Sequence, residues 1–214
     1  MFIFNKKKLM KTSNLILISL ASFGLTSCAL TNSVQKINYE PKFTVNEKLE
    51  KPQIIIIEAM TDNRGAADNK LLFNKKNMYN QTMSGAYLSE KPVTEILQEA
   101  IVYGLNKKNI SNSSNAELTL KSQLEKLDYE AISGFTTVQL IPQITVKFRL
   151  IDSNNKVIWM DMITGKATTR GTNFSKFFPP AIDNLVNQLL ESEEFISQIE
   201  NYSNIEKNNI VAEK

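Results

Sequence analysis

The sequence contains no histidine and a single cysteine among its 214 residues. Without histidine there is no Ser-His-Asp triad, no histidine-activated thiol and no imidazole ligand for a metal ion. One cysteine cannot form a disulfide within the chain. These absences exclude much of ordinary hydrolytic and zinc chemistry. We therefore expect no enzyme activity, no catalytic residues, no metal and no dissociable cofactor.

Basic residues outnumber acidic residues only because of the first 27 positions. The whole chain has 25 Lys and Arg against 22 Asp and Glu, and residues 1–27 hold Lys6, Lys7, Lys8 and Lys11 but no acid. Removing those four lysines leaves 21 basic and 22 acidic residues, a net charge near −1. Nucleic-acid recognition requires a clustered basic face, so we expect no nucleic-acid partner.

A short apolar segment follows these lysines. It covers residues 15–25 (LILISLASFGL) and is followed by small residues. A basic start, an apolar core and a small-residue site are typical of a secretory signal peptide, which we predict over residues 1–27. The core of about 11 residues is shorter than the ~20 that a transmembrane helix needs. An uncleaved membrane anchor is the alternative, which the well-formed small-residue site disfavours.

The lone cysteine stands directly after this segment. Leu25, Thr26, Ser27 and Cys28 resemble the lipobox of bacterial lipoproteins, in which an aliphatic residue and two small residues precede the cysteine. The resemblance implies cleavage between Ser27 and Cys28, a diacylglycerol on the thiol, and an N-acyl chain such as palmitate on the new amino group. Each buried methylene contributes ~0.8 kcal/mol, so two or three long chains make release negligible. A buried free cysteine is the alternative.

Ala29 bears on which membrane holds the anchor. In lipoproteins of Gram-negative bacteria an aspartate after the cysteine often marks retention in the inner membrane. Its absence implies an outer-membrane lipoprotein whose domain faces the periplasm. The membrane is then a partner through the lipid anchor, and an envelope protein or lipid is a further candidate partner.

The mature chain divides by composition into three parts. Residues 28–50 are polar with isolated apolar residues and no clear period, which is typical of a tether after the lipidated N-terminus. Residues 51–200 hold the periodic apolar patterns and are long enough for a single α+β domain. Residues 201–214 are polar, and we predict a disordered tail there.

Apolar runs and alternations predict the strands. The run at 53–59 (QIIIIEA) indicates a strand buried on both faces. Apolar residues weakly predict two further strands, at 71–74 and 81–88. They predict three more strands clearly, at 116–131, 138–150 and 157–169.

Three local features are predicted within this strand region. A change of phase predicts a bulge or break near 125–126. Pro142 cannot donate to a ladder, so its half of the strand is expected at an edge or a bulge. The stretch 152–156 (DSNNK) predicts a hairpin turn.

Two amphipathic helices are predicted. An apolar stripe runs from Val93 to Leu105, with Ser89 as its cap and Pro92 in its first turn. A second stripe runs from Ile182 to Leu190, with Pro179 and the proline after it at the entry. The order β-(β)-α-β-β-β-α predicts an α+β fold. In it, one mostly antiparallel sheet of about four to five strands carries both helices on one face.

Three stretches resemble, in this order, the YajG-like family of bacterial lipoproteins. They are IIIIEAMTDNRG at 54–65, NKKNMYNQTMSGAYLSEKPVTEILQEAI at 74–101 and KVIWMDMITG at 156–165. The resemblance covers roughly residues 50–200 of the chain. It implies location and fold more than activity, because the family itself has no well-defined activity.

The resemblance also singles out residues. It places Asp62 and Arg64 on an Asp-x-Arg loop after the first strand, and Trp159 on an aromatic position of the last long strand. The family tends to carry glycine beside Tyr79, where this chain has Asn80, so that loop is expected to bend differently. The element order is also similar to auxiliary lipoproteins of envelope lipid-transport systems, a likeness of fold that does not imply function.

Asp62 and Arg64 are the leading candidates for a small polar binding site or a partner contact. The alternative is a loop staple, in which Asp62 accepts backbone N–H bonds and Arg64 pairs with Asp62 or with a carbonyl. We favour the staple, because short polar loops commonly hold themselves together in this way.

Other candidates compete with ordinary structural roles. Trp159 and Phe148 could line a lipid or peptide groove, although core packing is favoured. Lys70, Lys75 and Lys76 could contact anionic headgroups, although a solvated loop is favoured.

Three strand acids could in principle do acid–base chemistry. Asp128 and Glu130 lie in one strand and Asp161 in a later one. Alternation along a strand places such residues on the solvent face, and that role is favoured.

Function is predicted at the level of location and class. The lipobox, the missing histidine and the lack of a convergent catalytic set favour a lipid-anchored outer-membrane lipoprotein. Its periplasmic domain would be a non-enzymatic binding or scaffolding module whose ligand the sequence does not identify. The alternative is an accessory lipoprotein subunit of an envelope lipid-transport (ABC-type) system, with a groove between helix and sheet. An envelope hydrolase that uses the strand carboxylates is the least favoured.

Overall fold

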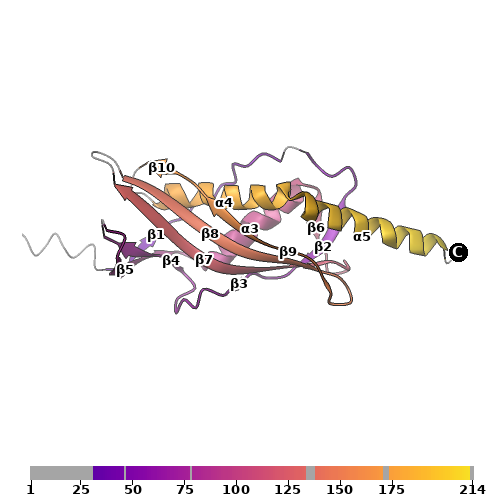
Figure 1. Cartoon of the computed structure of the whole chain (residues 1–214), viewed down its shortest axis with the longest axis horizontal. Helices are drawn as coiled ribbons and strands as arrows, with labels where there is room; N and C mark the ends of the chain where they lie inside the picture. The colour runs from indigo at the N-terminus through magenta and orange to yellow at the C-terminus, as the bar shows by residue number, and fades with distance from the viewer. Residues whose placement is uncertain (1–30, 46, 78, 134–137, 171–173, 213–214) are drawn as a thin grey trace, which may run out of the picture.

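The computed structural model describes residues 31–45, 47–77, 79–133, 138–170 and 174–212. The molecule is elongated, with the first described residues toward one end and the C-terminus at the other (Figure 1). The predicted signal peptide and lipobox, including Ser27 and Cys28, lie outside the described residues. No helix in the described ranges combines the length and apolarity needed to cross a bilayer.

A seven-stranded sheet forms the main layer, with strand order β10-β8-β7-β2-β6; β9 also pairs with β8, and β3 with β7. Its strands are β2 (Gln53–Ile57), β3 (Thr61–Asp62), β6 (Ile110–Asn112), β7 (Thr119–Ser133), β8 (Val138–Ile151), β9 (Val157–Lys166) and β10 (Thr169–Arg170). The long strands β7, β8 and β9 form an antiparallel meander. By contrast, β2 and β3 pair with β7 in parallel, as β2 does with β6.

Two of the three predicted features of the meander are confirmed. Asp152 closes the β8–β9 turn, because its Oδ1 accepts the backbone N–H groups of Asn154 and Lys156 at 2.9 Å each. The register of β7 shifts between Leu124 and Lys126, where a bulge was expected. Pro142 differs from the prediction, because its half of β8 is not at an edge: Pro142 pairs with Tyr129 of β7, and β9 and β10 pair with β8 on the other side. Pro142 falls in the gap between the β9 and β10 pairings.

A second sheet of three strands stands beside the first, in the order β1-β5-β4. It consists of β1 (Ser33–Gln35), β4 (Leu71–Lys76) and β5 (Thr82–Ser89), with β1 parallel and β4 antiparallel to β5. The α+β class is therefore confirmed, whereas a single sheet of about four to five strands is wrong. The described residues contain more strands than the sequence predicts, because several are too short to show an alternation.

Three helices complete the described fold: α3 (Val93–Lys107), α4 (Phe174–Glu191) and α5 (Glu193–Ala212). Both α3 and α4 carry buried stripes that pack into one core, and α4 lies along β8 and β9 (Figure 1). α5 continues to Ala212, across most of the range that the sequence interprets as a tail.

Two details of the helix predictions are wrong. α4 begins at Phe174, so Pro179 and Pro180 lie inside it and not at its entry. The turn before the prolines is held by Phe177 and Phe178, both buried, so packing outweighs the lost backbone bonds. The N-cap of α3 is Pro92, without a side-chain cap bond.

Ser89 is still part of β5 and does not cap α3. Its Oγ lies 3.1 Å from the carbonyl oxygen of Lys70 and 2.6 Å from that of Lys91. The hydroxyl therefore ties the strand to the loop that leads into the helix, and the helical N–H groups receive no bond from it.

The segment before β2 packs along the domain. Ile37, Tyr39, Phe43 and Val45 are partly buried against the core, and Leu49 is buried. The described part of the predicted tether, from residue 31, is therefore built into the fold.

Candidate functional site

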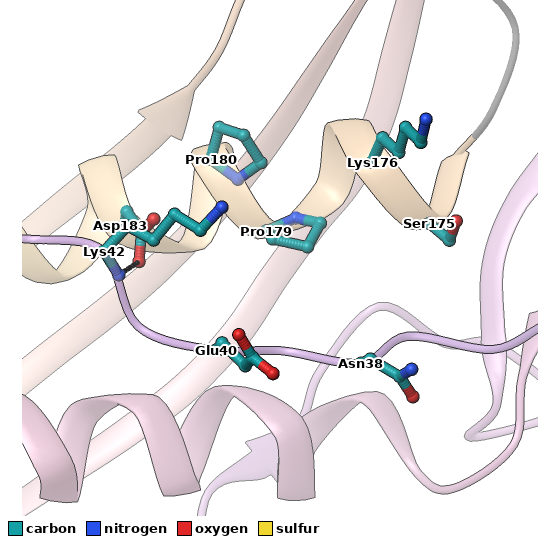
Figure 2. A pocket seen from close by; sticks show the side chains of 8 residues that line it. All are labelled: Asn38, Glu40, Lys42, Ser175, Lys176, Pro179, Pro180 and Asp183. Atoms are coloured by element: carbon teal, nitrogen blue, oxygen red, sulfur yellow. Dashed lines mark hydrogen bonds between the residues drawn. The ribbon is translucent and has the colours of Figure 1, made fainter.

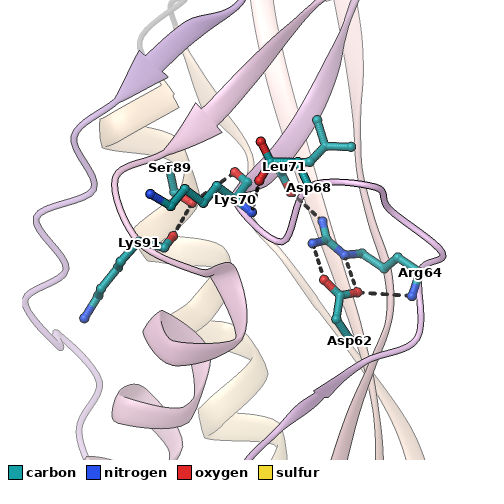
Figure 3. Close-up of polar contacts among 7 residues, drawn as sticks. All are labelled: Asp62, Arg64, Asp68, Lys70, Leu71, Ser89 and Lys91. Carbon is teal, nitrogen blue, oxygen red and sulfur yellow. Dashed lines mark hydrogen bonds and ion pairs between the residues drawn. The ribbon is translucent and has the colours of Figure 1, made fainter.

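Asp62 and Arg64 are in direct contact at the end of β3 (Figure 3). The guanidinium donates from Nε to Oδ1 at 2.8 Å and from Nη2 to Oδ2 at 2.6 Å, a bidentate pair. The backbone N–H of Arg64 also donates to Oδ1, at 3.1 Å. Nη1 donates to the carbonyl oxygen of Leu71 at 2.5 Å, which fastens the loop to β4.

This geometry is that of a staple. The Arg64 side chain is only 7% exposed and each of its three nitrogens donates to a protein oxygen. The hydrogen bond from Arg64 lowers the pKa of Asp62 below its ordinary 3.8, against the smaller opposing effect of desolvation. The pair can therefore position a loop, and it presents little open charge to a ligand.

The staple borders an open cavity of about 400 Å³ between β4 and β7. Its lining residues are Arg64, Gly65, Ala66, Leu71, Leu72, Phe73, Asn74, Glu125, Lys126 and Leu127. Glu125 already accepts a hydrogen bond from the Asn63 amide at 2.7 Å. The cavity can receive a small polar group or a peptide segment at the bulge of β7.

Asp62→Asn is expected to lower the free energy of unfolding by about 1 kcal/mol at neutral pH, because it weakens charge-assisted bonds. A carboxylate whose pKa is lower in the folded than in the unfolded protein stabilises the fold at any pH above its unfolded pKa. This stabilisation is lost as the pH falls through the folded pKa. The difference between wild type and variant is therefore full above pH ~4 to 5 and shrinks as pH falls through the lowered pKa. Urea titrations across this range measure it.

Glu130→Gln is the control, because Glu130 is exposed on β7. It is expected to change stability by less than about 0.5 kcal/mol. A pH-independent effect of Asp62→Asn, equal to that of the control, would show that the ion pair does not stabilise the loop.

A second open cavity, of about 380 Å³, lies between the N-terminal segment and α4 (Figure 2). Its lining residues are Asn38, Glu40, Lys42, Ser175, Lys176, Pro179, Pro180 and Asp183. Asp183 Oδ1 accepts from the hydroxyl of Tyr39 at 2.7 Å and from the backbone N–H of Lys42 at 3.3 Å. Burial, then the bond to Asp183, raise the pKa of Tyr39.

The sequence does not reveal this second cavity, because the composition of residues 28–50 indicates a tether. A weak signal was present. Ile37 and Tyr39, then Phe43 and Val45, are spaced by two, as expected of extended chain with one face on a core.

The remaining candidates do not join either cavity. Trp159 is buried, and its ring lies 4.9 Å from that of Phe195 in α5. Phe148 is buried too, so both belong to the core. Tyr79 is exposed in the β4–β5 turn, and Asn80 beside it adopts φ of +59°, the conformation in which glycine is favoured.

Two of the three candidate lysines are held by the protein. Lys75 is buried, with Nζ donating to the carbonyl oxygen of Thr31 at 2.7 Å. Lys76 Nζ donates at 2.7 Å both to Asp128 and to the carbonyl oxygen of Tyr129. The solvated-loop interpretation is therefore wrong for this pair. Over the described ranges, no three Cys, Asp or Glu side chains are grouped as a metal site would require.

No protein-family model matches the chain, and no curated protein matches it. Among solved structures, protein XCC0632 of Xanthomonas campestris, from family DUF330, is similar with a TM-score of 0.59. The two chains are 12% identical, and the match covers 79% of this chain and 99% of the other.

Two lipoprotein structures are more distant. A minor lipoprotein of Acinetobacter baumannii has a TM-score of 0.38 and 15% identity, covering 48% of this chain and 85% of that one. Lipoprotein GNA1162 of Neisseria meningitidis has a TM-score of 0.29 and 12% identity, covering 66% and 100%. The Xanthomonas protein alone among these three establishes a shared fold.

Proposed function

We propose that the chain is an outer-membrane lipoprotein, anchored by acyl chains on Cys28, whose domain faces the periplasm as a non-enzymatic binding or scaffolding module. The observation that carries the proposal is the Leu25–Cys28 lipobox directly after a signal-peptide pattern. The N-terminal segment supports it, because a chain that is bonded to its domain from residue 31 suits attachment close to a surface.

Membership of the YajG-like family is part of the same proposal. The fold has the expected order: β2, the Asp62–Arg64 loop, α3, and then a long hairpin that carries Trp159. The two open cavities have mixed polar lining, which suits a protein segment or a small polar ligand.

The accessory-subunit alternative calls for a lipid groove between helix and sheet. Along the described contact of α4 with β9 this space is filled, because Ile182, Leu185 and Leu189 are fully buried. Lipid that co-purifies with an unanchored domain, or a transporter subunit recovered by crosslinking in cells, would favour the alternative. Recovery of neither favours the scaffolding module.

Metabolic labelling with a palmitate analogue tests the anchor. We expect the wild-type protein to be labelled and to fractionate with the outer membrane, because the acyl chains cannot leave the bilayer. Cys28→Ala is expected to lose labelling completely, because it removes the only thiol in the chain.

Ala29→Asp is the matched control, because it changes the neighbouring residue and keeps the thiol. It should still be labelled, and a shift to the inner-membrane fraction would support outer-membrane sorting of the wild type. Continued labelling of Cys28→Ala would rule out this anchor.

A further inference from the structure

The first described residues are firmly attached to the small sheet. The carbonyl oxygen of Thr31 accepts from Lys75 Nζ at 2.7 Å, and Lys75 is only 8% exposed. Asn32 Oδ1 accepts from the backbone N–H of Ala86 at 3.0 Å. Ser33 then begins β1, in register with Tyr87 of β5. The chain is therefore fixed to the domain from Thr31 onward.

The direction of β1 shows where the preceding residues lead. Because β1 and β5 are parallel, the chain before Ser33 runs back toward Thr82, the first residue of β5. Thr82 pairs with Lys76 next to the β4–β5 turn. The small sheet lies toward the end of the molecule opposite the C-terminus, as the C-terminal end of β7 does (Figure 1).

The β4–β5 turn is joined to the tip of β7. Asn80 Oδ1 accepts from the backbone N–H of Ala131 at 3.3 Å, and Lys76 Nζ bonds the carbonyl oxygen of Tyr129. Two large apolar side chains are exposed on these paired elements, with Tyr79 75% exposed and Ile132 45% exposed. We call Thr31, Tyr79, Asn80, Ala131 and Ile132 the anchor-proximal end.

Chain length limits how far this end can stand from the membrane. Cys28 is three residues before Thr31, and extended chain spans at most ~3.6 Å per residue, which gives a reach of about 11 Å. If Cys28 carries acyl chains, the bilayer surface lies within that reach of Thr31. The domain therefore has no long tether on which to move away.

We propose that the anchor-proximal end rests on the bilayer that holds Cys28, with Tyr79 and Ile132 in the headgroup region. The inference rests on the proposed lipid anchor and adds an orientation to it. A tyrosine suits this place because its ring is apolar and its hydroxyl remains wet. Asp128, four residues before Ile132 on β7, is paired with Lys76, so its charge is compensated.

This orientation points the opposite end of the molecule into the periplasm. The β8–β9 turn, β6 and the C-terminal part of α5 lie toward that end (Figure 1). The membrane thus covers the exposed apolar side chains at the anchor-proximal end. Protein partners would bind elsewhere on the domain.

Site-specific fluorescence tests the orientation. In the mature lipoprotein the thiol of Cys28 is acylated, so one introduced cysteine is the only residue that a thiol-reactive NBD dye can label. The variants are Tyr79→Cys, Ile132→Cys and, as a matched control, Met160→Cys. Met160 is 57% exposed on β9 and pairs with Arg149 of β8. Leu140 of β8 pairs with Ala131, at the anchor-proximal end, and lies nine residues along the strand from Arg149. That separation is ~30 Å.

Each labelled mature lipoprotein is reconstituted in vesicles of phosphatidylethanolamine and phosphatidylglycerol that contain headgroup-proximal spin-labelled lipid. We expect quenching of about twofold or more at positions 79 and 132, because a label at the headgroup boundary lies ~5–10 Å into the interface. The label at position 160 should be unaffected.

Intact mass and vesicle flotation separate the two proposals. A protein that lacks the acyl mass or does not float contradicts the lipid anchor. A protein that is acylated and floats, but shows no quenching at positions 79 and 132, overturns the orientation alone. Quenching at position 160 equal to that at 79 also overturns it, because the domain would then lie on its side.

Discussion

Gly165→Ala is expected to lower the free energy of unfolding by about 3 kcal/mol, the upper end of the usual cost of overpacking. A Cβ on Gly165 would lie 2.6 Å from Leu185 Cβ and 2.8 Å from the Leu185 backbone nitrogen, and it would also overlap the carbonyl oxygen of Ala181. Two of these three atoms are backbone of α4, so a side-chain rotation cannot relieve the overlap. Both helix residues are fully buried.

Urea unfolding followed by far-ultraviolet circular dichroism measures this loss. Gly65→Ala is the matched control, because a Cβ there meets no atom within 4 Å and the only cost is its φ of +68°. That strain is about 1–2 kcal/mol. A Gly165→Ala protein as stable as wild type would mean that α4 does not approach β9 this closely.

Phe178→Ala is expected to cost about 4 kcal/mol, within the range for phenylalanine truncated in a core. Phe178 is fully buried in α4, and its ring meets that of Phe73 edge-on, with centroids 5.9 Å apart. Phe73 belongs to β4 and also contacts Tyr129 of β7, at 5.3 Å. One aromatic cluster therefore joins α4 to both sheets. Its loss should weaken the packing of α4 against each of the two sheets.

The same urea titration gives this value, with an unchanged slope if the transition stays cooperative. Met160→Ala serves as the surface control and should change stability by less than about 0.5 kcal/mol, because its side chain is exposed. A double-mutant cycle of Phe73→Leu with Phe178→Leu should show coupling of about 0.5–1.5 kcal/mol. A cost below about 1 kcal/mol for Phe178→Ala would contradict the cluster.

Features that depend on neighbouring residues could be predicted from the sequence. The Asp152 turn, the bulge before Lys126 and the stripe of α3 each arise from residues a few positions apart. The contact of Asp62 with Arg64 is of the same kind, because the two residues are separated by one position.

Features that depend on distant residues could not be predicted. The sequence predicts that Arg64 pairs with Asp62 or with a carbonyl, but only the fold identifies that carbonyl as the one of Leu71, at the start of β4. Ser89 is a plausible helix cap by composition, yet its hydroxyl is engaged by Lys70 and Lys91. α4 begins at Phe174 although two prolines follow inside it, because Phe177 and Phe178 are buried in the core.

The sequence by itself determined the class of the chain and the position of its predicted anchor, because a signal peptide and a lipobox are contiguous patterns that need no folded partner. Only the tertiary structure decided that the chain is held to the domain as early as Thr31. Residues after Cys28 resemble a tether in composition, but Lys75 and β5 fix the chain at Thr31. Those contacts join residues 44 or more positions apart, a separation that no local pattern records.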